Sequence, residues 1–403
     1  MPVSKIKPAP YWDEVTLPKF AALHRSFDAD VVIVGGGLTG ITSAVLLRDA
    51  RVRVALVERN KVGGIDTGCT SAHLTPVVDA HLDDLVSTLG RDHAQAVWDA
   101  GWAAIEQIET LVNRFDIDCD FSWVPGYLHV VVGAKPADAE KDRKRLRELA
   151  ALASDLEFDA SYADQAPLVG TPAMRVEHQA KFHPRKYLRA LLNELRESGA
   201  DVFEETNAEV TPAGVRVGAH EIRAPWIVMA THNPLQGRQS TLQASVLQTR
   251  LALYTSYVVR AELPGGAVMP GGAEMDEALF WDTHNPYHYL RIDKAEGKTF
   301  AIAGGADHKT GQVDDPDKCY GDVEAWLQQI APGARVTERW SGQVIETPDG
   351  LPYIGEMPGV RGWYYALGYG ANGLTAAVIA SGILCDFCLG RTSESARLFR
   401  LDR

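Results

Sequence analysis

A glycine-rich turn between two short apolar segments constrains the fold of this chain more than any other feature. Residues 31–34 form an unbroken apolar run, as expected of a parallel strand covered on both faces. Three glycines in the spacing G-x-G-x-x-G follow at once: Gly35, Gly37 and Gly40. Apolar residues then recur at helical spacing from Leu38, and a second apolar run over 52–57 ends in Glu58. This order within about 30 residues predicts an adenine dinucleotide site; the alternative is a tight turn that binds nothing.

Each part of this unit has a physical role in dinucleotide binding. The first glycine turns the chain tightly, Gly37 lets a pyrophosphate approach the backbone, and Gly40 lets the helix pack closely on the strand. The amides at the helix start are placed to face an anion. Glu58 is placed to accept a hydrogen bond from a ribose 2′-hydroxyl and would repel a 2′-phosphate. These features do not decide between NAD and FAD.

Length and charge limit the classes of protein to which the chain can belong. At 403 residues it exceeds the usual size of a single core, so two domains are expected. Its 40 Lys and Arg against 53 Asp and Glu give a formal net charge of −13, which argues against nucleic acid as a partner. No apolar stretch reaches the roughly eighteen residues of a membrane span, and the first residues lack the features of a secretory signal. We therefore expect a cytoplasmic protein.

The cysteines predict neither a disulfide framework nor a metal centre. The five are an odd number and are widely spread. Cys385 and Cys388 lie close together, but both fall on the apolar stripe of a late helical pattern, where buried small residues are expected. No second pair of ligands completes a zinc or iron–sulfur site in the sequence.

Two later regions complete the expected fold. Four segments with strand patterns are expected to form a large mixed or antiparallel sheet: residues 251–262, 278–281, 287–293 and 299–303. Near the end, a strand over 363–367 leads into Gly370, Asn372 and Gly373 and then a helix from Leu374. This second strand end followed by a helix N-terminus could stabilise negative charge on a reduced ring system.

The expected fold is α/β, with a Rossmann-like nucleotide-binding domain and an α+β substrate domain. The nucleotide-binding domain is expected to be discontinuous, because the pieces that fit it lie far apart in the sequence. Residues 1–27 are expected to form an irregular arm on the surface. The two domains are expected to contain these segments: 28–85, 176–235 and 335–403 for nucleotide binding, and 86–175 and 236–334 for substrate binding.

Several phrases spread along the chain carry a resemblance to a known family: TGCTSAHLTP, FHPRKYL, VMATHNP, AGGADHKTGQ, WSGQ, DGLPYIG and GYGANGLT. Over nearly its whole length the chain resembles the FAD-dependent oxidoreductases of the D-amino acid oxidase and glycine oxidase (DAO) superfamily. Within it, the phrases resemble a bacterial subgroup that often carries a C-terminal Rieske iron–sulfur domain. This chain stops after the last helical pattern and has no C-x-H or C-x-x-H pair, so that domain is expected to be absent. The resemblance implies a nucleotide-binding domain of the glutathione reductase type.

The resemblance implies FAD as the cofactor. A covalent link is not expected, since His73 and Cys69 do not lie in a linkage motif that matches. Glu58 is expected at the adenosine ribose, the glycine turn at the pyrophosphate, and residues 70–74 along the flavin. The implied cofactor-binding residues are Gly35, Gly37, Leu38, Thr39, Gly40, Glu58, Arg59, Thr70, Ser71, Ala72, His73, Leu74, Val210, Ala230, Thr231, His232, Gly370, Asn372, Gly373 and Leu374.

The resemblance also suggests residues that bind the substrate. Related amino acid oxidases hold the substrate carboxylate with an arginine on a strand of the large sheet, helped by a tyrosine hydroxyl. The corresponding side chains here are Tyr257, Tyr289 and Arg291. A structural ion pair is an equally good interpretation of Arg291. His284, His288 and Trp340 could border the same pocket, but packing is the favoured interpretation for each.

The function implied by the resemblance is oxidation of a C–N bond in a small amine or amino acid, by hydride transfer to flavin N5. Oxygen or another acceptor would then take the electrons. One alternative is an FAD-dependent dehydrogenase of a hydroxy acid or polyol that uses a quinone or a protein acceptor. Another is an electron-transfer flavoprotein that acts only with a partner, because a fold does not by itself fix a function.

Overall fold

The computed structural model of the protein describes residues 6–233, 242–268 and 272–403. Its α-helices are α1 (Leu38–Asp49), α2 (Leu82–Leu89), α3 (Arg91–Arg114), α4 (Pro136–Asp155), α5 (Pro184–Glu197), α6 (Leu242–Thr249), α7 (Pro316–Ile330) and α8 (Gly373–Cys388). Its 3-10 helices are η1 (Tyr11–Glu14), η2 (Asp66–Cys69) and η3 (Ser395–Phe399). Its strands are β1 (Phe27–Asp28), β2 (Val31–Val34), β3 (Val54–Val57), β4 (His73–Leu74), β5 (Ser122–His129), β6 (Ala160–Ala163), β7 (Ala173–Lys181), β8 (Asp201–Phe203), β9 (Glu209–Thr211), β10 (Gly214–Val217), β11 (His220–Arg223), β12 (Trp226–His232), β13 (Ala252–Glu262), β14 (Leu279–Asp282), β15 (Tyr289–Ala295), β16 (Lys298–Lys309), β17 (Arg335–Glu346), β18 (Tyr353–Glu356) and β19 (Trp363–Leu367).

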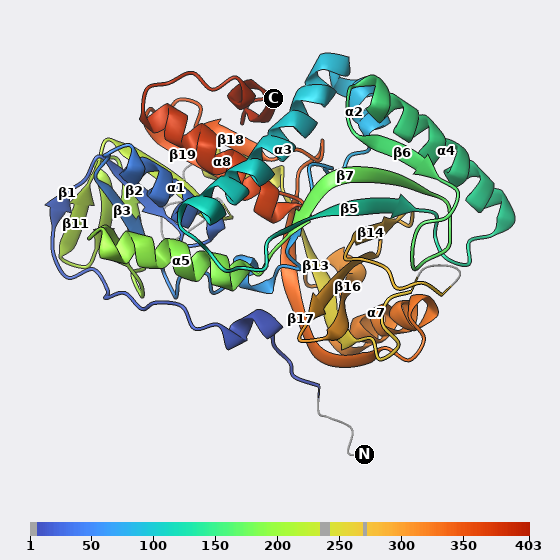
Figure 1. Cartoon of the computed structure of the whole chain (residues 1–403). Coiled ribbons are helices and arrows are strands. Elements are labelled where there is room, and N and C mark those ends of the chain that lie inside the picture. The colour runs from blue at the N-terminus through green and yellow to red at the C-terminus, as the bar shows by residue number, and fades with distance from the viewer. Residues whose placement is uncertain (1–5, 234–241, 269–271) are drawn as a thin grey trace.

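Among the described residues the strands form three sheets, which lie in two halves of the molecule (Figure 1). The first, called here the parallel sheet, has the order β18-β19-β12-β2-β3-β8, and its neighbours run parallel except β18 and β19. β2 lies between β12 and β3, with Val31 opposite both Trp226 and Val54. The chain passes from β2 through α1 to β3, which confirms the strand, turn, helix and strand predicted from the sequence.

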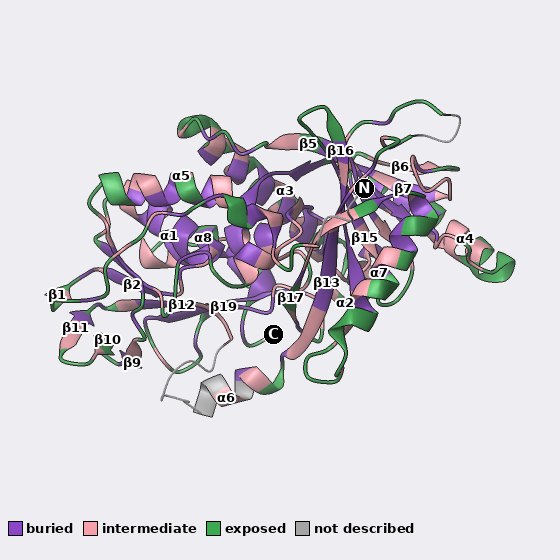
Figure 2. Ribbon diagram, turned by 90° about the horizontal axis from the view of Figure 1, so that it is seen from below, coloured by how far each residue is buried: buried purple, intermediate pink, exposed green. Residues whose placement is uncertain are grey.

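Alternating side chains of β2 bury both faces of the parallel sheet. Val31 and Ile33 point into a core formed with α1, α5 and α8, whereas Val32 and Val34 point into a second core. A small sheet of order β1-β11-β10-β9 closes the second core. In Figure 2, β2 and β12 lie between α1 and α8 on one side and β9 to β11 on the other. An unbroken apolar strand is therefore needed at the centre.

The large sheet forms the other half of the molecule. Its order is β17-β13-β16-β15-β14-β5-β7-β4, with β6 paired to β7. The parallel pair β14 and β5 makes it mixed, which confirms the expected large mixed sheet. On one face α7 packs on β13 and β16, and Tyr257 and Val259 point into this core. Ser256 and Val258 point from the opposite face, which is left to form the wall of a cavity.

Strand pairing places two segments differently from the expected domain division. β7 pairs with β5 over most of its length, so residues 176–181 lie in the large sheet. β17 pairs with β13 throughout, which places residues 335–346 in the large sheet as well. The sequence did not indicate these pairings, because a register between distant strands leaves no mark in the sequence of either strand. In addition α3, expected in the substrate domain, packs against α8. The boundary expected between 235 and 236 lies outside the described residues, and the rest of the division stays a prediction.

The N-terminal arm is anchored more deeply than a surface segment would be. Lys7 forms a β-bridge with Glu338 of β17. Trp12, in η1, is fully buried. The arm ends at β1, which pairs with β11 in the small sheet. It therefore joins both halves of the molecule, contrary to the expectation of an irregular surface arm, and its buried indole contributes a large apolar area.

In the described ranges no helix is both long and apolar enough to cross a membrane. Those ranges also hold no group of three or more His, Cys, Asp or Glu side chains that could bind a metal ion. All five cysteines are described and are free thiols. Burial raises the pKa of both Cys385 and Cys388, which fits apolar packing on α8.

Candidate cofactor and substrate site

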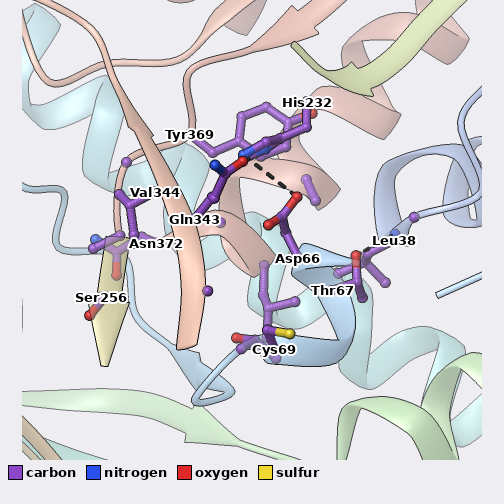
Figure 3. A pocket seen from close by; sticks show the side chains of 18 of the residues that line it. Leu38, Asp66, Thr67, Cys69, His232, Ser256, Gln343, Val344, Tyr369 and Asn372 are labelled. Atoms are coloured by element: carbon purple, nitrogen blue, oxygen red, sulfur yellow. Dashed lines mark hydrogen bonds and ion pairs between the residues drawn. The ribbon is translucent and has the colours of Figure 1, made fainter. Parts of the chain in front are cut away.

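A cavity of about 760 Å³ runs from the glycine turn of the parallel sheet to the free face of the large sheet. This volume is typical of sites for small molecules and cofactors. Figure 3 shows Leu38 and Thr67 on one side of the cavity and Ser256 and Val344 on the other. The two halves of the molecule therefore enclose one continuous space between the elements that were expected to bind cofactor and substrate.

The glycine turn has the geometry that a bound pyrophosphate requires. Gly35 has φ +116°, and a Cβ there would lie 2.2 Å from the carbonyl oxygen of Ala230 in β12. A Cβ on Gly40 would lie 2.0 Å from the carbonyl oxygen of Gly35, so α1 can pack on β2 only without a side chain at this position. Gly37 is different, because a Cβ there would approach Thr67 Oγ1 at 3.2 Å and enter the cavity.

Glu58, at the end of β3, is held with its carboxylate beside the glycine turn. Oε2 accepts a hydrogen bond from the N–H of Gly36 (2.8 Å), and Oε1 accepts one from the N–H of Asn60 (2.7 Å). The carbonyl oxygen of Glu58 accepts from the N–H of Thr206, and residues 206–208 line this part of the cavity. Val210 does not line it, because β9 pairs Val210 with Val215 in the small sheet. Residues 206–208, and not the predicted Val210, therefore line the cavity beside Glu58.

Residues 70–74 run along the cavity with alternating side chains. Thr70, Ser71 and His73 line it, whereas Ala72 and Leu74 are buried in the core. Ala72 has φ +59°, an uncommon backbone conformation for a residue with a side chain. Burial, together with the charge of Arg291, lowers the pKa of His73 to about 4, so its imidazole is neutral at pH 7.

Two indole N–H groups hold the backbone at Cys69 and Thr70 by hydrogen bonds to its carbonyl oxygens. The Nε1–H of Trp12 donates to the carbonyl of Thr70 (2.9 Å), and that of Trp340 donates to the carbonyl of Cys69 (2.8 Å). Trp340 is buried and does not line the cavity, which agrees with packing, the interpretation favoured for it, rather than with a place beside the pocket. Burial raises the pKa of the Cys69 thiol to about 11, which keeps it protonated and unreactive at neutral pH.

We expect the substitution Trp12→Phe to lower the free energy of unfolding by about 1 to 2 kcal/mol, because it removes the hydrogen bond to a buried carbonyl and keeps most of the apolar packing. Urea denaturation of the holoprotein would measure the change. Trp123→Phe is a matched control, since Trp123 is 36% exposed and its indole donates to the carboxylate of Glu109 near the surface. Equal losses in the two variants would contradict a special role of Trp12.

The N-terminus of α8 forms a second backbone wall. Gly370, Asn372, Gly373 and Leu374 all line the cavity. The side-chain amide of Asn372 donates to the carbonyl of Val77 (2.5 Å), which holds the turn against the segment after β4. Because α8 packs side by side with α1, two helix N-termini point at the same cavity. This arrangement favours negative charge on a group bound directly beside these two helix ends.

His232 and Asp66 both line the cavity and face each other (Figure 3), with 3.6 Å between Nε2 and Oδ2. Burial lowers the pKa of His232, and the carboxylate of Asp66 opposes this. The other predicted residues of this region, Leu38, Thr39, Arg59, Ala230 and Thr231, also line the cavity.

The residues expected to bind substrate are divided between the two faces of the large sheet. Tyr289 lines the cavity, and its hydroxyl lies 3.1 Å from Ser256 Oγ. Tyr257 points to the opposite face, where its hydroxyl lies 3.0 Å from His308 Nε2. His284 lines the cavity, but His288 stacks on Trp326 of α7. Successive residues of a strand point to opposite faces, which the sequence alone could not assign to core or cavity.

Arg291 does not line the cavity, and its guanidinium is occupied by internal partners. The side chain is 1% exposed, and Nε donates to Oδ1 of Asp293 (2.7 Å). Nη1 donates to the carbonyls of Ala72 (2.9 Å) and Phe182 (3.0 Å). The ion-pair interpretation therefore describes Arg291, and a carboxylate clamp at this position does not.

Several residues that line the cavity were not predicted: Asp79, Gln179, Tyr287, Asp307, Glu346 and Tyr369. Asp307 and Tyr369 lie in two of the phrases that carry the resemblance, AGGADHKTGQ and GYGANGLT. Those phrases were the signal by which these two residues could have been proposed as candidate site residues. The others come from separate segments, and no local pattern indicates that they meet.

The parallel sheet with its glycine turn, and the cavity that extends from it to the mixed sheet, have the arrangement of a nucleotide-binding enzyme. Residues 30–387 match the family described as FAD dependent oxidoreductase (DAO), so the chain belongs to this family. The expected α/β fold and the expected family are thereby confirmed. In the glycine turn, a Cβ at Gly35 or Gly40 would collide with a backbone carbonyl, whereas a Cβ at Gly37 would enter the cavity. This turn therefore fits the pyrophosphate of FAD.

Known proteins similar to this chain include curated relatives and a solved structure. A Bacillus subtilis (strain 168) protein described as a putative Rieske 2Fe-2S iron-sulfur protein is 28% identical over 407 residues, covering 99% of this chain and 76% of that protein. The gamma-glutamylputrescine oxidoreductase of Escherichia coli (strain K12) is 23% identical over 381 residues, covering 92% of this chain and 86% of that protein. The crystal structure of glycine oxidase from Geobacillus kaustophilus matches with a TM-score of 0.71 at 17% identity, covering 94% of this chain and 99% of that one. The protein is an FAD-dependent oxidoreductase.

Proposed function

We propose that the protein oxidises a C–N bond of a small amine or amino acid. The observation that carries the proposal is the continuous cavity between the glycine turn and the free face of the large sheet, because it can hold FAD and a small substrate together. The names of two similar proteins, gamma-glutamylputrescine oxidoreductase and glycine oxidase, support the choice of a C–N bond.

The proposed arrangement of FAD follows the residues that line the cavity. Glu58 would hold the adenosine ribose, Gly37 would lie against the pyrophosphate, and residues 70–74 with the N-terminus of α8 would border the ring system. FAD, when bound, supplies the redox chemistry by accepting a hydride at N5 and passing the two electrons on to oxygen or another acceptor.

In the proposed reaction the substrate carbon loses a hydride and its nitrogen loses a proton. The product is an imine, which water hydrolyses to a carbonyl compound and ammonia or an amine. The chain contributes position more than acid or base catalysis. His73 is neutral at pH 7 and can accept a hydrogen bond, but a pKa lowered to about 4 makes it a weak proton acceptor. Burial raises the pKa of Tyr289, so its hydroxyl stays protonated and can only orient.

Anaerobic titration of the purified holoprotein with amines, amino acids and hydroxy acids would test this function. We expect an amine to bleach the flavin band, because the cavity offers a shielded place for its carbon. Recovery in air would indicate an oxidase, and bleaching that persists in air would indicate a dehydrogenase with another acceptor. Bleaching by hydroxy acids alone, or by nothing, would overturn the proposal in favour of a hydroxy acid or polyol dehydrogenase or of a partner-dependent flavoprotein, respectively.

A further inference from the structure

Three carboxylates line the cavity without an ion-pair partner in the described part of the chain: Asp79, Asp307 and Glu346. Asp79 accepts hydrogen bonds from the hydroxyl of Tyr287 (3.1 Å to Oδ1) and the N–H of Ala371 (2.9 Å to Oδ2), both of which are neutral donors. Oδ1 of Asp307 is shielded from solvent and has no hydrogen-bond partner there. Carboxylates in such a place are costly unless a cation joins them.

These three groups lie close enough to repel one another. Burial raises the pKa of Glu346, and the charges of Asp79 and Asp307 raise it further. Burial raises the pKa of Asp307 to about 6, with a further contribution from Asp79. A positive charge between them would relieve both the repulsion and part of the desolvation cost.

The cationic side chains that line the cavity do not compensate these carboxylates. Arg59 and Lys61 follow directly after Glu58, at the nucleotide end. Arg145 is paired with Asp83 (3.0 Å) and Asp84 (2.9 Å). Arg291, the guanidinium that could have neutralised a substrate carboxylate, is held by Asp293 behind the cavity. The substrate side is therefore acidic and would repel a carboxylate.

Aromatic side chains lie on the same wall as the carboxylates. Trp281, Tyr287 and Tyr289 line the cavity, and the ring centroids of the two tyrosines are 6.3 Å apart. The hydroxyl of Tyr287 contacts Asp79, and that of Tyr289 contacts Ser256. Aromatic faces beside carboxylates are the combination that recognises alkylammonium groups.

Gln179 is an independent indication that a polar ligand enters this space. Its side chain is fully buried and lines the cavity, and neither atom of its amide has a hydrogen-bond partner in the described ranges. A buried amide left unpaired costs stability. An ammonium N–H can supply a donor for the carbonyl oxygen of this amide.

We infer that this wall, formed by Asp79, Asp307, Glu346, Tyr287 and Tyr289, binds a second ammonium group of the substrate. The substrate class is then a diamine or polyamine-like cation, oxidised at one amine and held at another, and not a free α-amino acid. This inference rests on the proposed function and narrows its substrate class. It also removes the need for an arginine clamp, which the position of Arg291 does not allow.

Three ligands with the same four-carbon chain separate the charges. They are 1,4-diaminobutane, 1-aminobutane and 4-aminobutanoate, which carry an ammonium, a methyl and a carboxylate at the far end. The oxidised holoenzyme would be mixed with each under anaerobic conditions. Saturation of the rate of flavin reduction gives the dissociation constant, and calorimetry gives it where no reduction occurs. We expect the diamine to bind at least about tenfold more tightly than 1-aminobutane, and 4-aminobutanoate to bind most weakly.

Neutral variants of nearly the same shape test the wall itself. Asp307→Asn and Glu346→Gln should each reduce the preference for the diamine over 1-aminobutane about tenfold, while the dissociation constant for 1-aminobutane stays within about twofold. The ratio is measured on the same protein, so a general loss of FAD or of stability cancels. Asp84→Asn is the matched control, because Asp84 also lines the cavity but already has Arg145 as its partner.

The outcomes separate this inference from the proposed function. Equal or tighter binding of 4-aminobutanoate, or variants that weaken all three ligands alike, would overturn the acidic recognition site even if amines reduce the flavin. Tight binding of the diamine without reduction by any amine would keep the recognition site and overturn the proposed function. If one variant fails to fold, the other makes the same prediction.

Discussion

Replacing Gly37 with alanine should yield a folded protein that no longer retains FAD. Gly37 caps α1 with φ −83°, a backbone conformation open to alanine, and the added methyl group would approach Thr67 Oγ1 at 3.2 Å. The methyl group would otherwise enter the cavity, where the pyrophosphate must come close to the backbone. We expect affinity for FAD to fall on the order of 100-fold, which equals about 2.7 kcal/mol.

Flavin absorbance per protein after gel filtration, together with circular dichroism of the same sample, would measure this result. Gly40→Ala gives the contrast, because its Cβ would lie 2.0 Å from a carbonyl oxygen and should disturb the fold as well as FAD binding. Gly382→Ala, at an exposed glycine of α8 with no atom near its Cβ, is the control and should keep both. A Gly37→Ala protein with normal flavin content would refute the pyrophosphate assignment.

The glycine turn could be predicted from the sequence because its requirements are local. The strand at 31–34 and the strand at 363–367 have the bounds that were predicted, since each is a short apolar run buried on both faces and followed by glycine. The helix from Leu38 was predicted for the same reason. Such elements are fixed by neighbours a few residues away, so a single sequence contains most of the information.

The substrate wall could not be predicted, because it depends on how distant strands align. Asp307 on β16 lies near Ser256 only through the register of β13 with β16, which contains an irregularity between Thr255 and Tyr257. Glu346 ends β17, a strand that was not predicted at all. A shift of one residue in any of these pairs would exchange the cavity face for the core face. The face on which Tyr257 lies was unknown for the same reason.

The substitution Arg291→Met should destabilise the fold without a selective effect on carboxylated substrates. Arg291 is 1% exposed and forms an ion pair with Asp293, which also contacts Nζ of Lys181 (3.1 Å). Its second role is to hold the carbonyl of Ala72, the residue with positive φ beside the cavity. Removing one partner of a buried ion pair typically costs about 3 to 5 kcal/mol, because the remaining charge stays buried. We expect a loss of this size in urea denaturation, accompanied by weaker FAD retention.

Two further variants separate this positioning role from a carboxylate clamp. Arg291→Lys keeps the charge but lacks the fork that reaches Asp293 and the carbonyls together, so it should restore only part of the stability. Arg260→Met removes a less buried arginine paired with Glu338 on the same sheet and should cost much less stability.

Substrate kinetics of those variants that can be assayed give the second comparison. The ratio of KM for an amine that carries a carboxylate to KM for an amine without one should equal the ratio for the unmodified enzyme. A normally stable Arg291→Met protein with KM raised more than about tenfold for the carboxylated amine alone would return Arg291 to the substrate site. It would also remove the main argument for a purely acidic wall, because a guanidinium would then face the substrate.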